Sequence, residues 1–205
     1  MASIKKKVVI LGSTGSIGES AIKVANDLSD RIEIIGIAAH KSGEKLLSQL
    51  NSTGARNVCL TQDDAAKSMR SKLPKDINFF TGEDGLVELA TLKEADIVLI
   101  SIVGVAGLRP ALAALEAGKD LAVASKEILV MAGEVVMETA AKNGGKVLPV
   151  DSEHNAIFQC LEGKESNEIS RLILTAYFVL RYQKQYRRYT QMDASMLLST
   201  TSGST

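Results

Sequence analysis

The stretch VVILGSTGSIG, residues 8–18, joins an apolar run to a glycine-rich loop. The apolar residues 8–11 predict a buried strand, and residues 17–28 predict a helix. A glycine-rich loop between the two presents backbone N–H groups and a positive helix end to a pyrophosphate. The spacing is G-x-x-G-x-x-G, and its position favours a dinucleotide-binding loop. The alternative is a tight strand-to-helix turn made of small residues.

Apolar runs and segments of helical period go on alternating along most of the chain. Further strands are expected at residues 32–39, 57–60, 77–80, 96–100, 121–124 and 146–150. Further helices are expected at residues 44–50, 63–73, 108–117, 129–141 and 157–161. Gly118 suits a left-handed end to the helix before it. Continuous apolar strands that alternate with helices predict an α/β fold, with a doubly wound and mostly parallel sheet.

The bulk composition is that of an ordinary globular protein. Its 205 residues include 24 basic and 24 acidic side chains, so nothing indicates a nucleic-acid partner. The two cysteines, Cys59 and Cys160, form no C-x-x-C motif, which argues against a disulfide scaffold or a zinc ribbon. The first apolar run is too short for a signal peptide or a membrane span. We therefore expect a cytoplasmic protein with no membrane partner.

The end of the second expected strand bears on the choice of cofactor. NAD-binding domains usually carry an acid there, which binds the ribose 2′-hydroxyl. This chain has His40, Lys41 and Ser42 instead, and no acid before Glu44. A lysine with hydroxyl groups favours the 2′-phosphate of NADP(H). The alternative is that Lys41 is a solvated lysine at a helix start.

Ser125, Lys126 and Glu127 follow another strand, at the carboxyl edge where ligands collect in α/β sheets. Lys126 could hold an anionic or carbonyl oxygen, with Glu127 orienting the lysine. The same residues also suit a helix start, with Ser125 as the N-cap and Glu127 in the first turn. The residues alone leave both interpretations open.

Asp151 and Glu153 come directly after the last expected strand. Two carboxylates at this spacing can reach one hard cation, and oxygen ligands without a Cys or His cluster favour Mg²⁺ or Mn²⁺. The alternative is a capped helix, with Asp151 or Ser152 as the N-cap. His154 alone is more typical of a hydrogen-bonded structural residue than of a base.

Three motifs together resemble those of the 1-deoxy-D-xylulose 5-phosphate reductoisomerase family. They are GSTGSIG at 12–18, ASKE at 124–127 and LPVDSEHNAIFQ at 148–159, and the resemblance runs from about residue 6 to residue 176. It implies that a divalent metal assists the rearrangement of a sugar phosphate. The resulting aldehyde is reduced by NADPH, and the product, 2-C-methyl-D-erythritol 4-phosphate, feeds isoprenoid synthesis.

The resemblance also assigns roles to residues. Lys126 corresponds to a substrate-binding lysine, Asp151 and Glu153 to catalytic metal ligands, and Ser152 and Glu153 to residues beside the substrate. The implied NADPH-binding residues are Gly12, Thr14, Gly15, Ser16, Ile17, His40, Lys41, Ser42, Ser125 and Glu127. Many relatives have Gly at position 40 and Asn at positions 42 and 125, so the detail of the 2′-phosphate contacts differs here. Residues 1–150 are then a Rossmann-like NADPH-binding domain, and residues 151–176 begin an α+β catalytic domain.

The composition changes abruptly after Ala176. All four tyrosines lie at or beyond position 177, and the family's Ser-Gly-Gly-Pro-Phe-Arg continuation is replaced by other residues. We expect residues 177–205 to be a disordered tail or the product of out-of-frame translation. The alternative is a genuine C-terminus in which residues 181–188 form a basic surface helix.

The family's phosphate-binding serine, tryptophan-bearing lid, Asn-Lys pair and third metal carboxylate have no counterpart in this sequence, which contains no tryptophan. We therefore expect NADPH binding with negligible turnover. A homodimer is expected for the full-length family but is doubtful for this chain. Two alternatives are a non-catalytic NADP(H)-binding module and another NADP-dependent reductase, such as a semialdehyde dehydrogenase. The second lacks a nucleophile, because Cys160 falls within an expected amphipathic helix.

Overall fold

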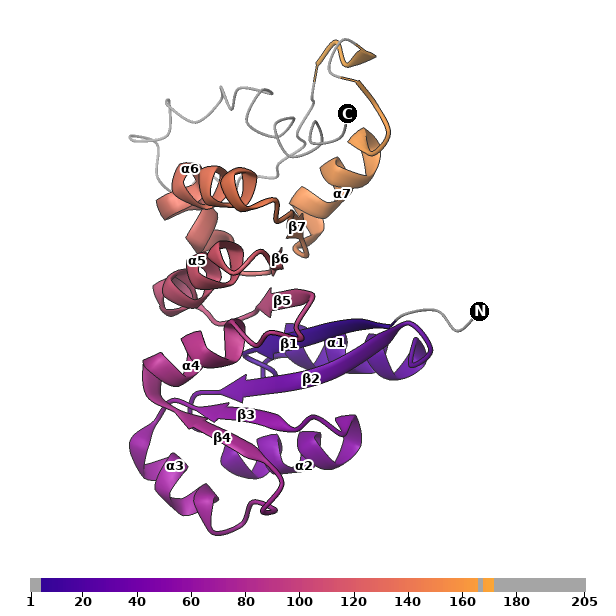
Figure 1. The fold of residues 1–205 in the computed structure, drawn as a ribbon. Helices are drawn as coiled ribbons and strands as arrows, with labels where there is room; N and C mark the ends of the chain where they lie inside the picture. Colours follow the sequence, from indigo (N-terminus) through magenta and orange to yellow (C-terminus); the bar gives the residue numbers. More distant parts are fainter. Residues whose placement is uncertain (1–4, 166–167, 172–205) are drawn as a thin grey trace, which may run out of the picture. The chain divides into compact units, whose positions relative to one another are not determined.

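The computed structural model describes residues 5–165 and 168–171 of the chain. Two compact units are present, Met1–Asn155 and Ala156–Thr205. The first unit contains the sheet and the helices that cover it (Figure 1). The expected tail at 177–205, and the end of the segment 151–176, lie outside the described residues.

Strands and helices alternate regularly through the first unit. The strands are β1 (Lys6–Leu11), β2 (Ile32–Ala39), β3 (Asn57–Leu60), β4 (Asn78–Thr81), β5 (Ile97–Ile100), β6 (Asp120–Val123) and β7 (Val147–Pro149). The helices are α1 (Ser16–Asp27), α2 (Gly43–Thr53), α3 (Asp63–Arg70), α4 (Gly82–Ala90), η1 (Gly104–Gly107, a 3₁₀ turn), α5 (Leu108–Glu116), α6 (Lys126–Asn143) and α7 (Ser152–Leu161). None of these described helices is both long and apolar enough to cross a bilayer.

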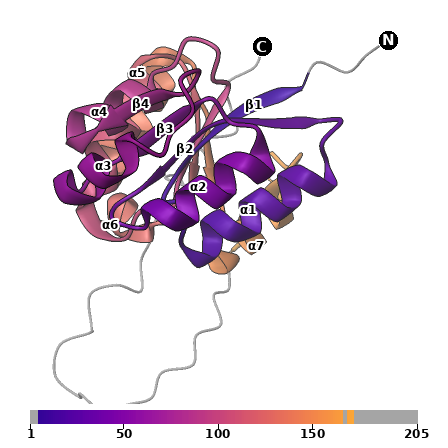
Figure 2. The ribbon, with the colours of Figure 1, turned by 90° about the horizontal axis from the view of Figure 1, so that it is seen from below.

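The seven strands form one parallel sheet in the order β4-β3-β2-β1-β5-β6-β7, which can be followed in Figure 1. The chain first builds outward from β1 to β4 and then returns to the other side of β1. Parallel crossovers are right-handed, so reversing the direction of winding moves the connecting helices to the opposite face. Figure 2 shows α1 and α2 on one side of β1 and β2, with α4 on the other.

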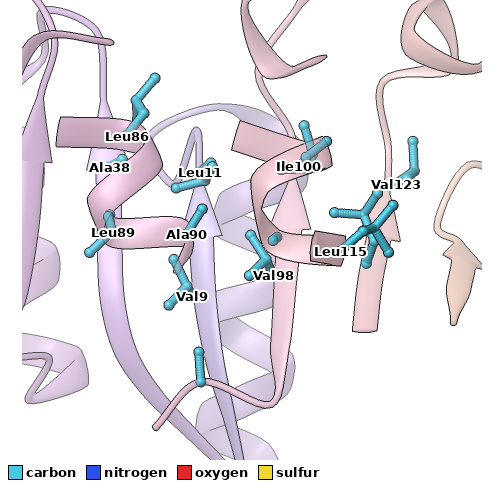
Figure 3. Packing of buried hydrophobic residues seen from close by; sticks show 14 of the residues in the cluster. Val9, Leu11, Ala38, Leu86, Leu89, Ala90, Val98, Ile100, Leu115 and Val123 are labelled. Atoms are coloured by element: carbon cyan, nitrogen blue, oxygen red, sulfur yellow. The ribbon is translucent and has the colours of Figure 1, made fainter. Parts of the chain in front are cut away.

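Each face of the sheet has its own apolar core. Successive residues of β1 belong to different cores, because side chains of a strand point alternately to opposite faces. Val9 and Leu11 belong to one cluster with Leu89 of α4 and Leu115 of α5, and Figure 3 shows residues of this cluster. Ile10 belongs to the other cluster, with residues from α1, α2 and α3. Both faces are covered, as the continuous apolar strands predict.

The predicted α/β, doubly wound, parallel fold is confirmed. β2 has the predicted bounds, and Gly118 adopts a left-handed φ of 70° after α5. Two elements were not predicted from the sequence, the 3₁₀ turn η1 and the nine-residue helix α4, whose glycines and short apolar stripe give a weak helical signal. α6 also begins three residues before the expected helix, at Lys126.

Candidate functional site

The carboxyl ends of the central strands lie side by side. Hydrogen bonds continue past the strand ends, from Ser101 N to Leu11 O at 2.8 Å and from Ala124 N to Ile100 O at 3.0 Å. Val150 N likewise donates to Val123 O at 2.9 Å. The loops that follow β1, β5, β6 and β7 therefore meet at one edge, beside the point where the strand order reverses. Ligands bind at this switch point in open α/β sheets.

Two glycines of the loop after β1 are required by close packing. Gly12 has a φ of 95°, and a Cβ on it would lie 2.8 Å from the carbonyl carbon of Ser101. A Cβ on Gly18 would lie 2.4 Å from the Gly12 carbonyl oxygen. Gly12 lets the loop pass over β5, and Gly18 lets α1 pack onto the loop.

Gly15 is not required in this way. A Cβ on it would meet only the Gly12 carbonyl oxygen, at 3.4 Å, and its φ of −81° is open to any residue. Gly15, Ser16 and Ile17 are exposed where α1 begins, with Ile17 39% exposed. The first N–H groups of a helix have no intrahelical acceptor and attract anions. The open Gly15 and these N–H groups fit a pyrophosphate.

Side chains of α2 also form hydrogen bonds with the glycine loop. Ser13 is fully buried, and its hydroxyl donates to Oε1 of Gln49 at 2.7 Å. Nε2 of Gln49 donates to the Ser13 carbonyl at 2.8 Å, and Nζ of Lys45 donates to the Thr14 carbonyl at 2.8 Å. These contacts were not predicted from the sequence. The available signal was a polar residue, Gln49, inside the apolar stripe of α2 beside Leu46 and Leu50.

The segment after β2 is open and positively charged. His40 and Lys41 are exposed, and Nδ1 of His40 lies 2.8 Å from the Thr61 hydroxyl oxygen. Glu44, the next acid, forms an ion pair with Lys72. Among residues 5–165 and 168–171, Lys41 has no ion-pair partner. The segment therefore offers an uncompensated cation where a 2′-phosphate would lie.

Ser125 and Glu127 interact at the start of α6. Ser125 is the N-cap by position but makes no capping bond with its side chain. Its hydroxyl donates instead to Oε2 of Glu127 at 2.9 Å. The backbone N–H of Glu127 and then this hydroxyl lower the pKa of the Glu127 carboxyl, which stays ionised at neutral pH. Ser125 therefore occupies the expected N-cap position. Its hydroxyl is bonded to Glu127 and does not cap the first N–H groups of α6.

Asp151 precedes α7 and binds His154 twice. Oδ1 accepts the His154 backbone N–H at 2.9 Å, and His154 Nδ1 lies 2.7 Å from Oδ1 and 2.8 Å from Oδ2. Burial alone would raise the pKa of Asp151, but the bonds from His154 outweigh it and the pKa is lowered. Asp151 thus caps the helix, as one interpretation expects. A carboxylate has about four acceptor positions, so capping leaves capacity for other ligands.

Glu153 lies near two other charges. Oε2 accepts the Ser152 hydroxyl at 2.9 Å, and this bond, followed by the residue's own N–H, lowers the pKa of Glu153. Lys126 lowers it further, whereas Asp151 opposes the shift. The charge of Glu153 therefore interacts with that of Lys126, from the loop after β6, and with that of Asp151, from the loop after β7.

The two carboxylates fit a hard divalent cation in kind, since Mg²⁺ and Mn²⁺ take oxygen ligands. Their mutual repulsion is what a cation between them would relieve. Within the described ranges no group of three or more His, Cys, Asp or Glu side chains is arranged to hold a metal. A cation at this pair would therefore take two of its ligands from these carboxylates.

Comparison with known proteins decides the family. A family model described as 1-deoxy-D-xylulose 5-phosphate reductoisomerase matches residues 8–133, more than half of the chain. The chain belongs to the 1-deoxy-D-xylulose 5-phosphate reductoisomerase family. A model of the C-terminal domain of these reductoisomerases matches residues 147–199. The predicted resemblance is confirmed, which excludes an unrelated NADP-dependent reductase.

Relatives and solved structures agree with this result. The reductoisomerase of Thermoanaerobacter sp. (strain X514) is 44% identical over 171 residues, covering 83% of this chain and 44% of the relative. A reductoisomerase structure in complex with magnesium has a TM-score of 0.75 at 38% identity, covering 78% of this chain and 40% of that one. The Zymomonas mobilis reductoisomerase in complex with NADPH has a TM-score of 0.73 at 36% identity, covering 77% and 41%. The chain spans less than half the length of these reductoisomerases.

Proposed function

We propose that this chain carries the NADPH-binding half and two metal-ligating carboxylates of a 1-deoxy-D-xylulose 5-phosphate reductoisomerase. The reaction converts that sugar phosphate into 2-C-methyl-D-erythritol 4-phosphate with oxidation of NADPH. The observation that carries the proposal is that one sheet edge joins the glycine loop, Ser125–Glu127 and the carboxylates of Asp151 and Glu153 in a member of this family.

NADPH is assigned to the edge around β1 and β2. The N–H groups at Ser16 and Ile17 bind the pyrophosphate beside the open Gly15, whose own N–H donates to the Gly12 carbonyl, and residues 40–42 bind the 2′-phosphate. Gly12 and Thr14 shape the loop, and Ser125 and Glu127 lie toward the nicotinamide end. The Zymomonas mobilis reductoisomerase, which was solved in complex with NADPH, supports this cofactor for the family.

The chemistry is assigned to the loops after β6 and β7. When bound, the divalent cation supplies Lewis-acid polarisation of the substrate oxygens, and NADPH supplies the hydride. Asp151 and Glu153 would hold the cation. Lys126, whose charge interacts with that of Glu153, orients a substrate oxygen, and the Ser152 hydroxyl lies beside it. The magnesium complex of a 38% identical reductoisomerase supports the choice of metal.

Coenzyme preference tests the cofactor assignment. The 205-residue chain is titrated with NADPH and with NADH, following nucleotide fluorescence, for the native sequence and for Lys41→Ala. We expect the native chain to prefer NADPH and the variant to lose about tenfold of that preference, because one charge-assisted contact to the 2′-phosphate is removed. Lys67→Ala, an exposed lysine on α3, is the matched control. Equal affinity of the native chain for both coenzymes would contradict the assignment.

Turnover is tested separately. NADPH oxidation with 1-deoxy-D-xylulose 5-phosphate and Mg²⁺ or Mn²⁺ is expected to be negligible for the 205-residue chain, because two carboxylates hold a hard cation weakly. Measurable oxidation would refute this expectation. The sugar phosphate is the expected small-molecule partner. We propose that homodimerisation belongs to the full-length family, which sedimentation of this chain beside a full-length relative would test.

A further inference from the structure

Gln49 forms a buried reciprocal pair with Ser13, 36 residues away along the chain. One amide gives both bonds, accepting from the Ser13 hydroxyl at 2.7 Å and donating to the Ser13 carbonyl at 2.8 Å. Gln49 is 8% exposed and Ser13 is fully buried. Buried polar groups are costly to leave unpaired, so the pair specifies one position for the loop.

A second contact lies one turn earlier on the same face of α2. Nζ of Lys45 donates to the Thr14 carbonyl at 2.8 Å and forms an ion pair with Glu19 of α1 at 2.6 Å. Lys45 and Gln49 are four residues apart, the spacing of neighbours on one helix face. α2 therefore holds two successive carbonyl groups of the glycine loop.

These contacts determine where the loop's N–H groups point. In a trans peptide the C=O and the following N–H point in opposite directions. The Ser13 carbonyl faces Gln49, so the Thr14 N–H faces away from α2. Without the Gln49 amide, this peptide unit could turn and present a carbonyl oxygen to a bound anion, which would repel it.

We propose that Gln49 is a positioning residue for the cofactor, which fixes the peptide between Ser13 and Thr14 so that the loop binds the pyrophosphate of NADPH. This inference rests on the proposed function. α2 begins at Gly43, directly after residues 40–42, so one helix connects the proposed 2′-phosphate segment with the pyrophosphate loop. Gln49 acts through Ser13 and does not touch the cofactor.

The test compares two ligands that differ in the pyrophosphate. The 205-residue chain and Gln49→Leu are titrated with NADPH and with adenosine 2′-monophosphate, which carries the 2′-phosphate but no pyrophosphate. We expect NADPH affinity to fall about tenfold and adenosine 2′-monophosphate affinity to change less than about twofold. A merely structural role would weaken both equally.

Asn57→Leu is the matched control. Asn57 is 6% exposed and its amide donates to the Ile35 carbonyl at 2.8 Å, but it lies at the opposite end of its strand from the loop edge. We expect it to lower the melting temperature without changing NADPH affinity in the folded protein. Unchanged NADPH affinity in Gln49→Leu, or equal weakening for both ligands, would overturn the inference.

Amide hydrogen exchange without any nucleotide separates this inference from the proposed function. In Gln49→Leu, residues 13–18 are expected to exchange faster than in the native chain, and in Asn57→Leu at the native rate. If the native chain bound no NADPH, the proposed function would fail. The exchange rates would still show whether Gln49 holds the loop in place. Native exchange rates in the Gln49→Leu loop would refute it.

Discussion

Gly12 lies directly against the backbone of Ser101, 89 residues later in the chain. The Ser101 hydroxyl donates to the Leu11 carbonyl at 2.9 Å, and the Ser101 carbonyl carbon would be 2.8 Å from a Cβ on Gly12. The end of β1 and the end of β5 are thus joined at the point where the strand order reverses. Close packing therefore requires a glycine at position 12, whereas it does not require one at position 15.

Gly12→Ala is expected to destabilise the fold by about 2 kcal/mol or more, because a left-handed φ and a backbone clash combine. Gly15→Ala should change stability by less than about 1 kcal/mol but weaken NADPH binding at least tenfold, since its Cβ would enter the anion site. Urea denaturation and NADPH titration of both variants measure the two effects. Normal NADPH affinity in Gly15→Ala would contradict the assigned loop.

Asp151→Asn and Asp151→Ala separate helix capping from metal binding. Asn caps a helix about as well as Asp, whereas Ala costs about 1 kcal/mol. We therefore expect Asp151→Asn to keep native stability and lose Mn²⁺ affinity at least tenfold, because one of two ligand charges is removed. Electron paramagnetic resonance of free Mn²⁺ gives the affinity, with Asp63→Asn on α3 as the control. Native Mn²⁺ binding by Asp151→Asn would mean that Asp151 only caps the helix.

The two thiols should react very differently. Burial, with a smaller effect of the Glu88 charge, raises the pKa of Cys59 to about 12, and its side chain has no exposed surface. Cys160 is exposed. Thiolates, not thiols, react with iodoacetamide. Mass spectrometry after labelling at about pH 8 should find Cys160 modified and Cys59 modified only after denaturation; equal labelling rates in the native protein would be inconsistent with this core.

The ion pair between Lys45 and Glu19 predicts a pH dependence. The hydrogen bond and charge of Lys45 lower the pKa of Glu19 in the folded protein. A lowered folded pKa contributes stability above the unfolded pKa, and this is lost as pH falls through the folded value. Glu19→Gln should therefore lower the urea midpoint at about pH 7, with the difference narrowing toward about pH 3. Glu116→Gln, an exposed glutamate on α5, is the control. A difference that is constant with pH would argue against the pair.

The change in composition after Ala176 can be tested on the coding DNA. If out-of-frame translation caused it, another reading frame downstream of codon 176 encodes Ser-Gly-Gly-Pro-Phe and the later family motifs. If no frame restores them, residues 177–205 are a genuine C-terminus. Resequencing this region distinguishes the two.

Local pattern was enough for most of the fold. The apolar residues of β2 predicted its bounds, since a strand buried on both faces needs a continuous apolar run. α4 was not predicted, because this helix has only nine residues and its large buried apolar residues, such as Leu86 and Leu89, are few. α4 packs on β1, β3 and α5, which a local sequence window does not contain.

The candidate site also has features that local sequence predicts and features that depend on long-range packing. Local sequence was enough to predict the strand-to-helix glycine loop, the absence of an acid after β2 and the two polar stretches after β6 and β7, because each depends on neighbouring residues. Three long-range relationships are visible only in the folded chain: Ser13 pairs with Gln49, Ser101 lies on Gly12, and the charge of Lys126 reaches Glu153. These pairs arise from strand order and helix packing, which bring distant residues together in ways that local periodicity does not specify.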